Sequence, residues 1–169
     1  MDNKTIAQLF NHDFNNGNFR FYDAQGKEVY YENSNKFWSK RKYDAQGKEV
    51  YFENSDKYWA KCEYDAQGNK VYWEDSDKFW AKRKYDAHGK EVYYETSDKY
   101  WAKCEYDAHG NRVYYENSDK YWAKREYNAQ GNEVYYENSN GAIRDTRPKV
   151  SCEQKTVVID GVEHKLVRK

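Results

Sequence analysis

Long apolar stretches and a surplus of charge are missing from this sequence, and it contains a single proline. No run reaches the 18 apolar residues typical of a membrane span, and the first residues lack a signal-peptide pattern. The 29 basic and 29 acidic residues cancel, so no net charge would draw the chain to nucleic acid or an anionic membrane. We therefore expect a cytoplasmic protein whose partner is neither a membrane nor a nucleic acid.

Cysteine is scarce as well, and the chain has only Cys62, Cys104 and Cys152. An odd number of cysteines without a secretion signal favours free thiols. Cys62 and Cys104 occupy equivalent positions 42 residues apart. In a flat meander four strands would separate them, about 19 Å, so a disulfide would need a fold that wraps strongly.

Aromatic side chains are abundant instead. Seven Phe, six Trp and nineteen Tyr make up 19% of the chain, whereas aliphatic residues are few. A charged fraction of 34% would by itself suggest disorder. Because each aromatic side chain buries about 150–250 Å², a few rings per structural unit can replace the missing Leu and Ile. The core is therefore predicted to consist of rings.

A Tyr-Asp/Asn-Ala-Gln/His-Gly motif recurs with a strict period of 21 residues, beginning at Tyr22, Tyr43, Tyr64, Tyr85, Tyr106 and Tyr127. Within one unit, alternating runs over 58–64 and 70–74 flank an Asp65–Gly68 turn. Each unit is thus predicted to be one β-hairpin, and no helical period is present. Six such repeats predict an all-β, elongated and twisted antiparallel meander.

The second turn of each repeat has an unexpected residue. In the last unit this turn ends on Gly141, but in the five internal units the same position is Lys36, Lys57, Lys78, Lys99 and Lys120. If the backbone is left-handed there, lysine costs about 1 kcal/mol relative to glycine. Either the turn has another geometry, or these lysines are present because they are exposed along one edge.

Charges suggest a register for the hairpins. If four residues close the Asp–Gly turn, opposite charges pair in four hairpins: Lys42 with Glu49, Glu63 with Lys70, Lys84 with Glu91, and Glu105 with Arg112. The order of the signs alternates with a 42-residue period, so these pairs amount to two independent observations. In the alternative register, a G1 bulge at Gly47 and its equivalents shifts each partner by one residue.

In the charge-paired register the two faces of the sheet differ. The predicted core face carries Tyr58, Ala60, Cys62, Tyr64, Val71 and Trp73. The other face repeats one tryptophan and one lysine per unit, namely Trp38, Trp59, Trp80, Trp101 and Trp122 with Lys40, Lys61, Lys82, Lys103 and Lys124. Equivalent tryptophans would recur at about 9.6 Å, twice the strand spacing. These ten residues are the candidate binding residues, and a second packed layer made of the same rings is the alternative.

The period divides the chain. Residues 18–141 form the predicted array, 1–17 a cap with a short helix over 5–10, and 142–150 a linker. Residues 151–169 are predicted to form a β-hairpin with an Asp160-Gly161 turn. Both termini are expected to cap the open ends of the array.

Catalytic and metal-binding patterns do not emerge. His88 and His109 occupy a turn position that is glutamine in other repeats. Acidic turns such as 53–56 lack a recognisable calcium-loop pattern, and no nucleophile, base and orienting group come together. We expect no enzyme, no cofactor and no bound metal.

The pattern Trp-x-x-x-x-Tyr-Asp-x-x-Gly-Asn-x-x-x-Tyr resembles the YD repeats of bacterial RHS-type proteins and MORN-variant repeats over about 18–141. MORN-type units keep a glycine where this chain has Lys57, and RHS repeats belong to very large shells that enclose toxins. The chain is more similar to small, standalone hairpin-repeat proteins of bacteria and phages. This resemblance implies non-enzymatic binding of a protein partner, as by a phage or mobile-element protein that inhibits a host defence enzyme. A carbohydrate-binding module with a Trp ladder and a self-assembling, homo-oligomeric structural protein are the alternatives.

Overall fold

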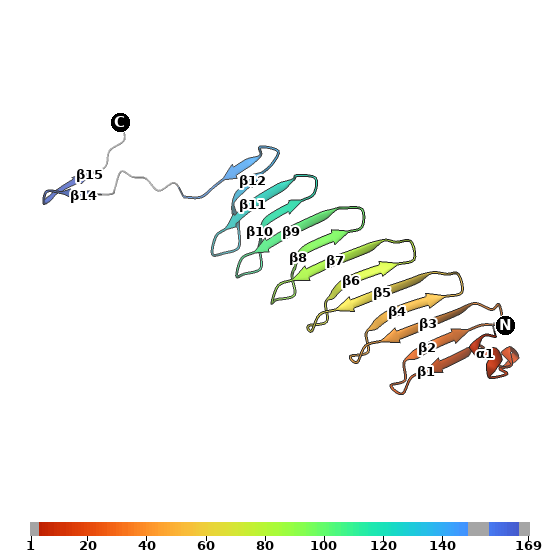
Figure 1. Ribbon diagram of the computed structural model, residues 1–169. Coiled ribbons are helices and arrows are strands. Elements are labelled where there is room, and N and C mark those ends of the chain that lie inside the picture. Colours follow the sequence, from red (N-terminus) through yellow and green to blue (C-terminus); the bar gives the residue numbers. More distant parts are fainter. Residues whose placement is uncertain (1–3, 149–155, 166–169) are drawn as a thin grey trace.

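A computed structural model describes residues 4–148 and 156–165, and its main body is one antiparallel sheet of thirteen strands paired in sequence order (Figure 1). The strands are β1 (Phe19–Tyr22), β2 (Glu28–Glu32), β3 (Trp38–Tyr43), β4 (Glu49–Asn54), β5 (Trp59–Tyr64), β6 (Lys70–Asp75), β7 (Trp80–Tyr85), β8 (Glu91–Thr96), β9 (Trp101–Tyr106), β10 (Arg112–Asn117), β11 (Trp122–Tyr127), β12 (Glu133–Asn138) and β13 (Ile143–Asp145). The predicted all-β meander is confirmed. Three residues of the expected linker form β13, which pairs with β12.

The array has a single layer, and its two faces differ as expected. The face with Trp38 and Lys40 and their equivalents is called the tryptophan face, and the other, with Ala60, Cys62 and Trp73, the opposite face. The small residues Ala81 and Ala123 are fully buried on the opposite face, between half-buried rings. Because one layer cannot enclose large side chains, the core consists of rings that shield one another, such as Trp73 and Phe79 with centroids 5.6 Å apart.

The charge-paired register is wrong at the turns. Glu49 lies across from Tyr43 rather than Lys42. The amide of Gly47, at φ +78°, donates to the Asp44 carbonyl, and the Asp44 carboxylate accepts from the Lys48 amide at 2.8 Å. This is the G1-bulged turn of the alternative register. It prevails because an exposed ion pair contributes at most about 1 kcal/mol, less than the combined turn hydrogen bonds and the glycine conformation.

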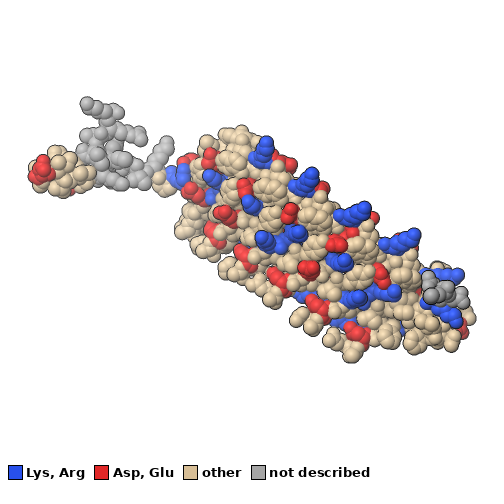
Figure 2. Space-filling model, in the orientation of Figure 1, with Lys and Arg blue, Asp and Glu red and all other residues tan. Residues whose placement is uncertain are grey.

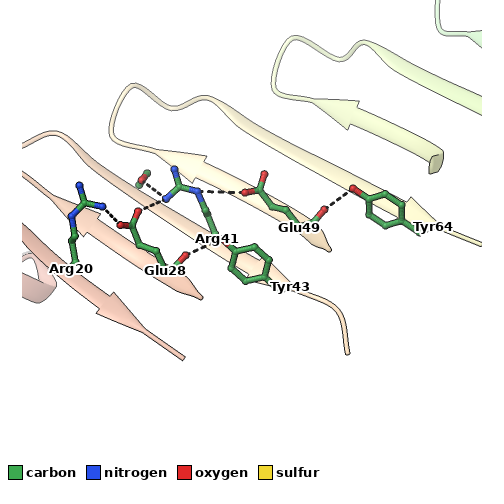
Figure 3. A network of polar contacts seen from close by, with 7 residues as sticks. Arg20, Glu28, Arg41, Tyr43, Glu49 and Tyr64 are labelled. Atoms are coloured by element: carbon green, nitrogen blue, oxygen red, sulfur yellow. Dashed lines mark hydrogen bonds and ion pairs between the residues drawn. The ribbon is translucent and has the colours of Figure 1, made fainter. Parts of the chain in front are cut away.

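A second bulge at the start of each return strand restores the predicted faces for the rest of that strand. In β4, Val50 is the extra residue, so that Lys42 lies across from Tyr51 and Arg41 from Phe52. Two one-residue shifts add up to two residues, and side chains alternate with a period of two, so the side chains from Tyr51 onward keep their predicted face. Glu49 lies between the two shifts and changes face, so that it pairs with Arg41 at 3.4 Å instead of Lys42. Near the bulge the Glu49 carbonyl accepts a hydrogen bond from the Tyr64 hydroxyl at 3.1 Å, which joins this hairpin to the next (Figure 3).

The same bulges shear the sheet. Lys61 lies across from Glu74, and Glu74 lies across from Trp80. Lys61, and not Trp59, is therefore aligned with Trp80, so each repeat is displaced by two residues along the strands. With a rise of about 3.4 Å per residue and about 4.8 Å between strands, equivalent tryptophans are about 12 Å apart. The predicted 9.6 Å is wrong because it assumed an unsheared sheet.

The lysine turns do adopt the left-handed conformation. Lys36, Lys57, Lys78, Lys99 and Lys120 have φ between 64° and 71°. In the turn after β6 the Lys78 amide donates to the Asp75 carbonyl at 3.1 Å, and the Asp75 amide to the Phe79 carbonyl at 3.0 Å. This is again a G1-bulged turn, with lysine at the position where glycine is usual.

Replacing Lys78 with glycine is expected to stabilise the array by about 0.5 kcal/mol. The relief of left-handed strain, about 1 kcal/mol, outweighs the greater flexibility of glycine in the unfolded chain. Urea unfolding of Lys78→Gly measures this gain. Gly131→Ala is the matched control, because Gly131 has φ +81° and open space around its Cα. It should destabilise by about 1 kcal/mol, and a Lys78→Gly variant that destabilises as well would contradict the strain argument.

The N-terminal cap lies on the tryptophan face of the first hairpin. Helix α1 (Ile6–Leu9) begins at a Thr5 capping box and is followed by the 3₁₀ turn η1 (Phe14–Asn16). Thr5 and Ala7 both donate to the carboxylate of Glu32, which is 1% exposed. The predicted short helix is confirmed. The helix packs over Glu32, and Phe10 at its end stacks on Phe19 of β1 with ring centres 5.8 Å apart, while Leu9 remains 65% exposed.

The C-terminal hairpin forms as predicted. Strands β14 (Thr156–Ile159) and β15 (Val162–Lys165) pair only with each other in the described structure. Asp160 and Gly161 both have positive φ, 53° and 80°, as a two-residue hairpin turn requires. Its role as a cap stays a prediction, as do the domain boundaries. Neither helix of the described residues is long and apolar enough to cross a membrane.

Candidate functional site

The ten predicted binding residues lie together on the tryptophan face. Trp59 opens β5, and Lys61 follows two positions later, so that both side chains point to the same side. Each lysine ammonium of this kind lies 4.6–5.4 Å from the centre of the preceding indole ring. All five indoles are half-buried, and four of the five lysines are exposed. The lysines therefore shield one side of each ring through a cation–π contact.

A row of glutamates completes this surface. The ammonium of Lys61 is 3.6 Å from the carboxylate of Glu74, and Glu74 lies across from Trp80 on the next strand. Lys40 pairs in the same way with Glu53, at 3.1 Å. The shear thus aligns tryptophan, lysine and glutamate in an oblique row that runs from hairpin to hairpin. Figure 2 shows basic and acidic groups interspersed along oblique rows of the array.

Tyrosines hold the glutamates in place from within the same strand. The hydroxyl of Tyr114 donates to Glu116 at 3.1 Å, and Lys103 donates to its other oxygen at 3.0 Å. The hydrogen bond from Lys103 lowers the pKa of the Glu116 carboxyl. The bond to Glu74, together with partial burial, raises the pKa of Tyr72 to about 12. These carboxylates are thus fixed acceptors whose hydrogen bonds are already used within the fold.

The opposite face has a different network. Arg20, Glu28, Arg41 and Glu49 alternate in charge across β1 to β4, and Arg41 bridges the two glutamates at 2.9 and 3.4 Å (Figure 3). The chain of ion pairs stops at β5, where the arginine position holds Cys62. On this face Arg41, Arg83 and Arg125 also lie over aromatic rings of the neighbouring strands. We interpret this face as structural.

Cysteines and histidines do not assemble into a reactive site. Cys62 and Cys104 are free and half-buried, as expected, and Cys152 lies outside the described residues. His88 and His109 are exposed at turn tips. Across the described ranges, no group of three or more His, Cys, Asp or Glu side chains could hold a metal ion.

Sequence reasoning found the tryptophans and lysines but missed the glutamates as part of the same row. Glu53 and its equivalents recur in every repeat, which was a visible signal. The assumed register, however, placed Tyr72 across from Lys61, where the structure has Glu74. The row therefore emerges only once the two bulges are known. The alternative of a second packed layer is not observed in the described structure, whose array strands form one sheet.

Comparisons with known proteins identify a fold. No protein-family model and no curated protein sequence matches this chain. The structure of TcdB2–TccC3 without its hypervariable C-terminal region matches with a TM-score of 0.51, at 15% identity, over 70% of this chain and 7% of that one. TcdB2–TccC3 itself matches with a TM-score of 0.50, at 14% identity and with the same coverage.

A further match is the Photorhabdus luminescens Tc holotoxin pore, with a TM-score of 0.46 at 14% identity, covering 75% of this chain and 9% of that one. The chain thus corresponds to less than a tenth of the length of these toxin proteins. At such identities the two TcdB2–TccC3 structures establish only a shared fold. That fold is a tandem array of β-hairpins, which is the part of the sequence resemblance that the structure confirms.

Proposed function

We propose that the array is a non-enzymatic scaffold that binds a protein partner through its tryptophan face. The observation that carries this proposal is the continuous row of half-buried indoles, lysines and glutamates on a face over which residues 4–148 place no second sheet. Rings rimmed by charged groups are typical of protein interaction sites, where tryptophan contributes disproportionately to affinity. Because the row is held by hydrogen bonds within the sheet, little side-chain entropy is lost on binding.

The geometry favours a protein over a glycan. A sugar stacks on the face of an aromatic ring, but a lysine ammonium already lies over one face of each of the five indoles, for example 4.8 Å from the centre of the Trp80 ring. A sugar that stacked on that face would have to displace the lysine. A protein can instead contact the exposed ring edges and pair with the lysines and glutamates.

The structural neighbours support association with proteins, since both contain TcdB2 together with TccC3. We carry only that role over to this chain. The finer form of the proposal comes from the sequence resemblance. In this finer form, the present chain is a protein of a phage or mobile element, its partner is an enzyme of a host defence system, and binding inhibits that enzyme. Activity of the purified partner with and without the array tests this form.

Trp80→Ala is expected to weaken binding of a stoichiometric partner at least about 30-fold, the effect of losing one tryptophan hot spot. The partner is first captured from bacterial lysate on immobilised protein and identified, and its affinity is then measured by calorimetry. Trp73→Ala is the matched control, because Trp73 is the one tryptophan of the opposite face and is also half-buried.

The control should bind like the unmodified protein. Equal losses in both variants would show that the tryptophan face is not the interface. Capture of glycans without any protein would favour the carbohydrate-binding alternative, and capture of further copies of the chain would favour self-assembly.

A further inference from the structure

The five turn lysines are not explained by the fold. All are exposed and left-handed, although Gly141 fills the same turn position in the last repeat without strain. Elsewhere in the array, lysine ammonium groups do make contacts: that of Lys48 donates to the Gly68 carbonyl, and that of Lys61 pairs with Glu74. Within the described residues the turn lysines have no hydrogen bond or ion pair from their ammonium groups. Strained residues without a structural contact indicate a role in function.

A depression adjoins one of these lysines. It measures about 210 Å³ and lies between Trp59 and Trp80, with Glu74, Asp75, Lys78 and Phe79 completing its lining. Both carboxylates of the lining are already engaged. Glu74 binds Lys61 and Tyr72, and Asp75 accepts from the amides of Asp77 and Phe79 at 3.0 and 3.3 Å. The groups left for a ligand are thus two indoles and the ammonium of Lys78.

The turn lysine recurs along one edge of the array. The turns after β4, β6, β8 and β10 place a lysine at each repeat, about 12 Å apart by the sheared register, and basic groups project at regular intervals along an edge in Figure 2. An exposed aspartate precedes Lys57, Lys78, Lys99 and Lys120. The edge therefore alternates in charge, which disfavours a continuous polyphosphate and favours separate carboxylates.

We propose that this edge binds an acidic segment of the protein partner. An apolar or aromatic side chain of that segment enters the depression between Trp59 and Trp80, and its carboxylates pair with the turn lysines. This inference rests on the proposed function and specifies the chemistry of the partner: a protein segment in which acidic residues are interspersed with rings or large apolar side chains.

The test uses a fluorescein-labelled copolymer of glutamate and tyrosine, with polyglutamate and single-stranded DNA of similar length as comparison probes. In one variant Lys57, Lys78, Lys99 and Lys120 are all replaced by glycine, and in a matched variant all four are replaced by arginine. Fluorescence anisotropy should show that the copolymer binds more tightly than polyglutamate. The glycine variant should bind about tenfold more weakly or worse, since each exposed ion pair contributes roughly a two- to fivefold effect.

The glycine variant cannot fail merely by unfolding, because glycine suits these turns and should raise its thermal midpoint. The arginine variant should keep the affinity of the unmodified protein. Unchanged affinity of the glycine variant would overturn the inference. If Trp80→Ala still weakened copolymer binding in that case, the tryptophan face would remain the binding surface and only the lysine edge would fail.

If neither the glycine variant nor Trp80→Ala changed copolymer binding, the copolymer would bind elsewhere on the chain and the inference would be overturned, while partner capture would still decide the proposed function. A copolymer that does not bind at all would overturn the inference alone, because partner capture tests the proposed function independently. Tighter binding of single-stranded DNA that is lost in the glycine variant would replace a protein segment with a nucleic acid as the ligand of this edge.

Discussion

Raising the pH above about 10 is expected to unfold the array cooperatively, because its tyrosines resist ionisation in the folded state. Burial raises the pKa of Tyr43, Tyr64 and Tyr85 above the ordinary value of 10.0, and the bond to Glu74 raises that of Tyr72 to about 12. Folded tyrosines therefore hold more protons than unfolded ones above pH 10, so stability falls as the pH rises through this window. The contribution is fully present below the unfolded pKa and is lost as the pH rises through the folded pKa.

Tyr72→Phe isolates one of these groups. The phenyl ring cannot bind Glu74, so the variant should be about 1 kcal/mol less stable at neutral pH. It also has no proton to lose, so the gap between the two proteins should close as the pH rises from about 9 to about 12. Urea unfolding followed by circular dichroism across this range measures the gap. A gap that stays constant would contradict a raised pKa for Tyr72.

The second large effect is expected at the N-terminal cap. Glu32→Ala should cost about 3 kcal/mol, because the buried carboxylate accepts from the Thr5 hydroxyl at 2.7 Å, the Ala7 amide at 3.3 Å and the Tyr30 hydroxyl at 2.6 Å. Removing the side chain leaves these donors without an acceptor and opens a cavity beneath α1. Hydrogen exchange of residues 5–10 should accelerate strongly, while the distal hairpins should keep their protection, since each hairpin contacts only its neighbours.

Glu53→Ala provides the matched control for Glu32. Glu53 occupies the equivalent position one repeat later, but it is half-buried and pairs with Lys40 and Tyr51 instead of a helix. Its loss should cost about 1 kcal/mol. Equal losses at the two positions would mean that Glu32 does not anchor the cap. Urea unfolding of both variants decides between these outcomes.

The elements of this fold were predictable because their signals are local. Asp44 and Gly47 determine a turn through hydrogen bonds within four residues, and alternation over runs such as 58–64 determines a strand. The strict period then extends one hairpin to six. The short helix and the Asp160-Gly161 turn were predictable for the same reason.

The register was not predictable from charge. The opposite charges of Lys42 and Glu49 suggested that they form a cross-strand pair. The turn and the bulge at Val50 instead place Tyr51 across from Lys42. An exposed ion pair contributes too little to outweigh backbone hydrogen bonds and turn conformation. The faces from Tyr51 onward were nevertheless assigned correctly, because the two bulges together displace the strand by an even number of residues. Glu49, between the two bulges, was assigned to the wrong face.

By itself, the sequence determined the hairpins, their order, the two faces and the ten residues of the tryptophan face, since each follows from turn chemistry and from a period of two within a strand. Only the tertiary structure decided the shear, the row that joins Lys61, Glu74 and Trp80, and the left-handed turns at lysine. These depend on how hydrogen bonds between neighbouring strands accommodate extra residues. The same bulge recurs in all six hairpins, and its hydrogen bonds between strands are not visible in a pattern of charges.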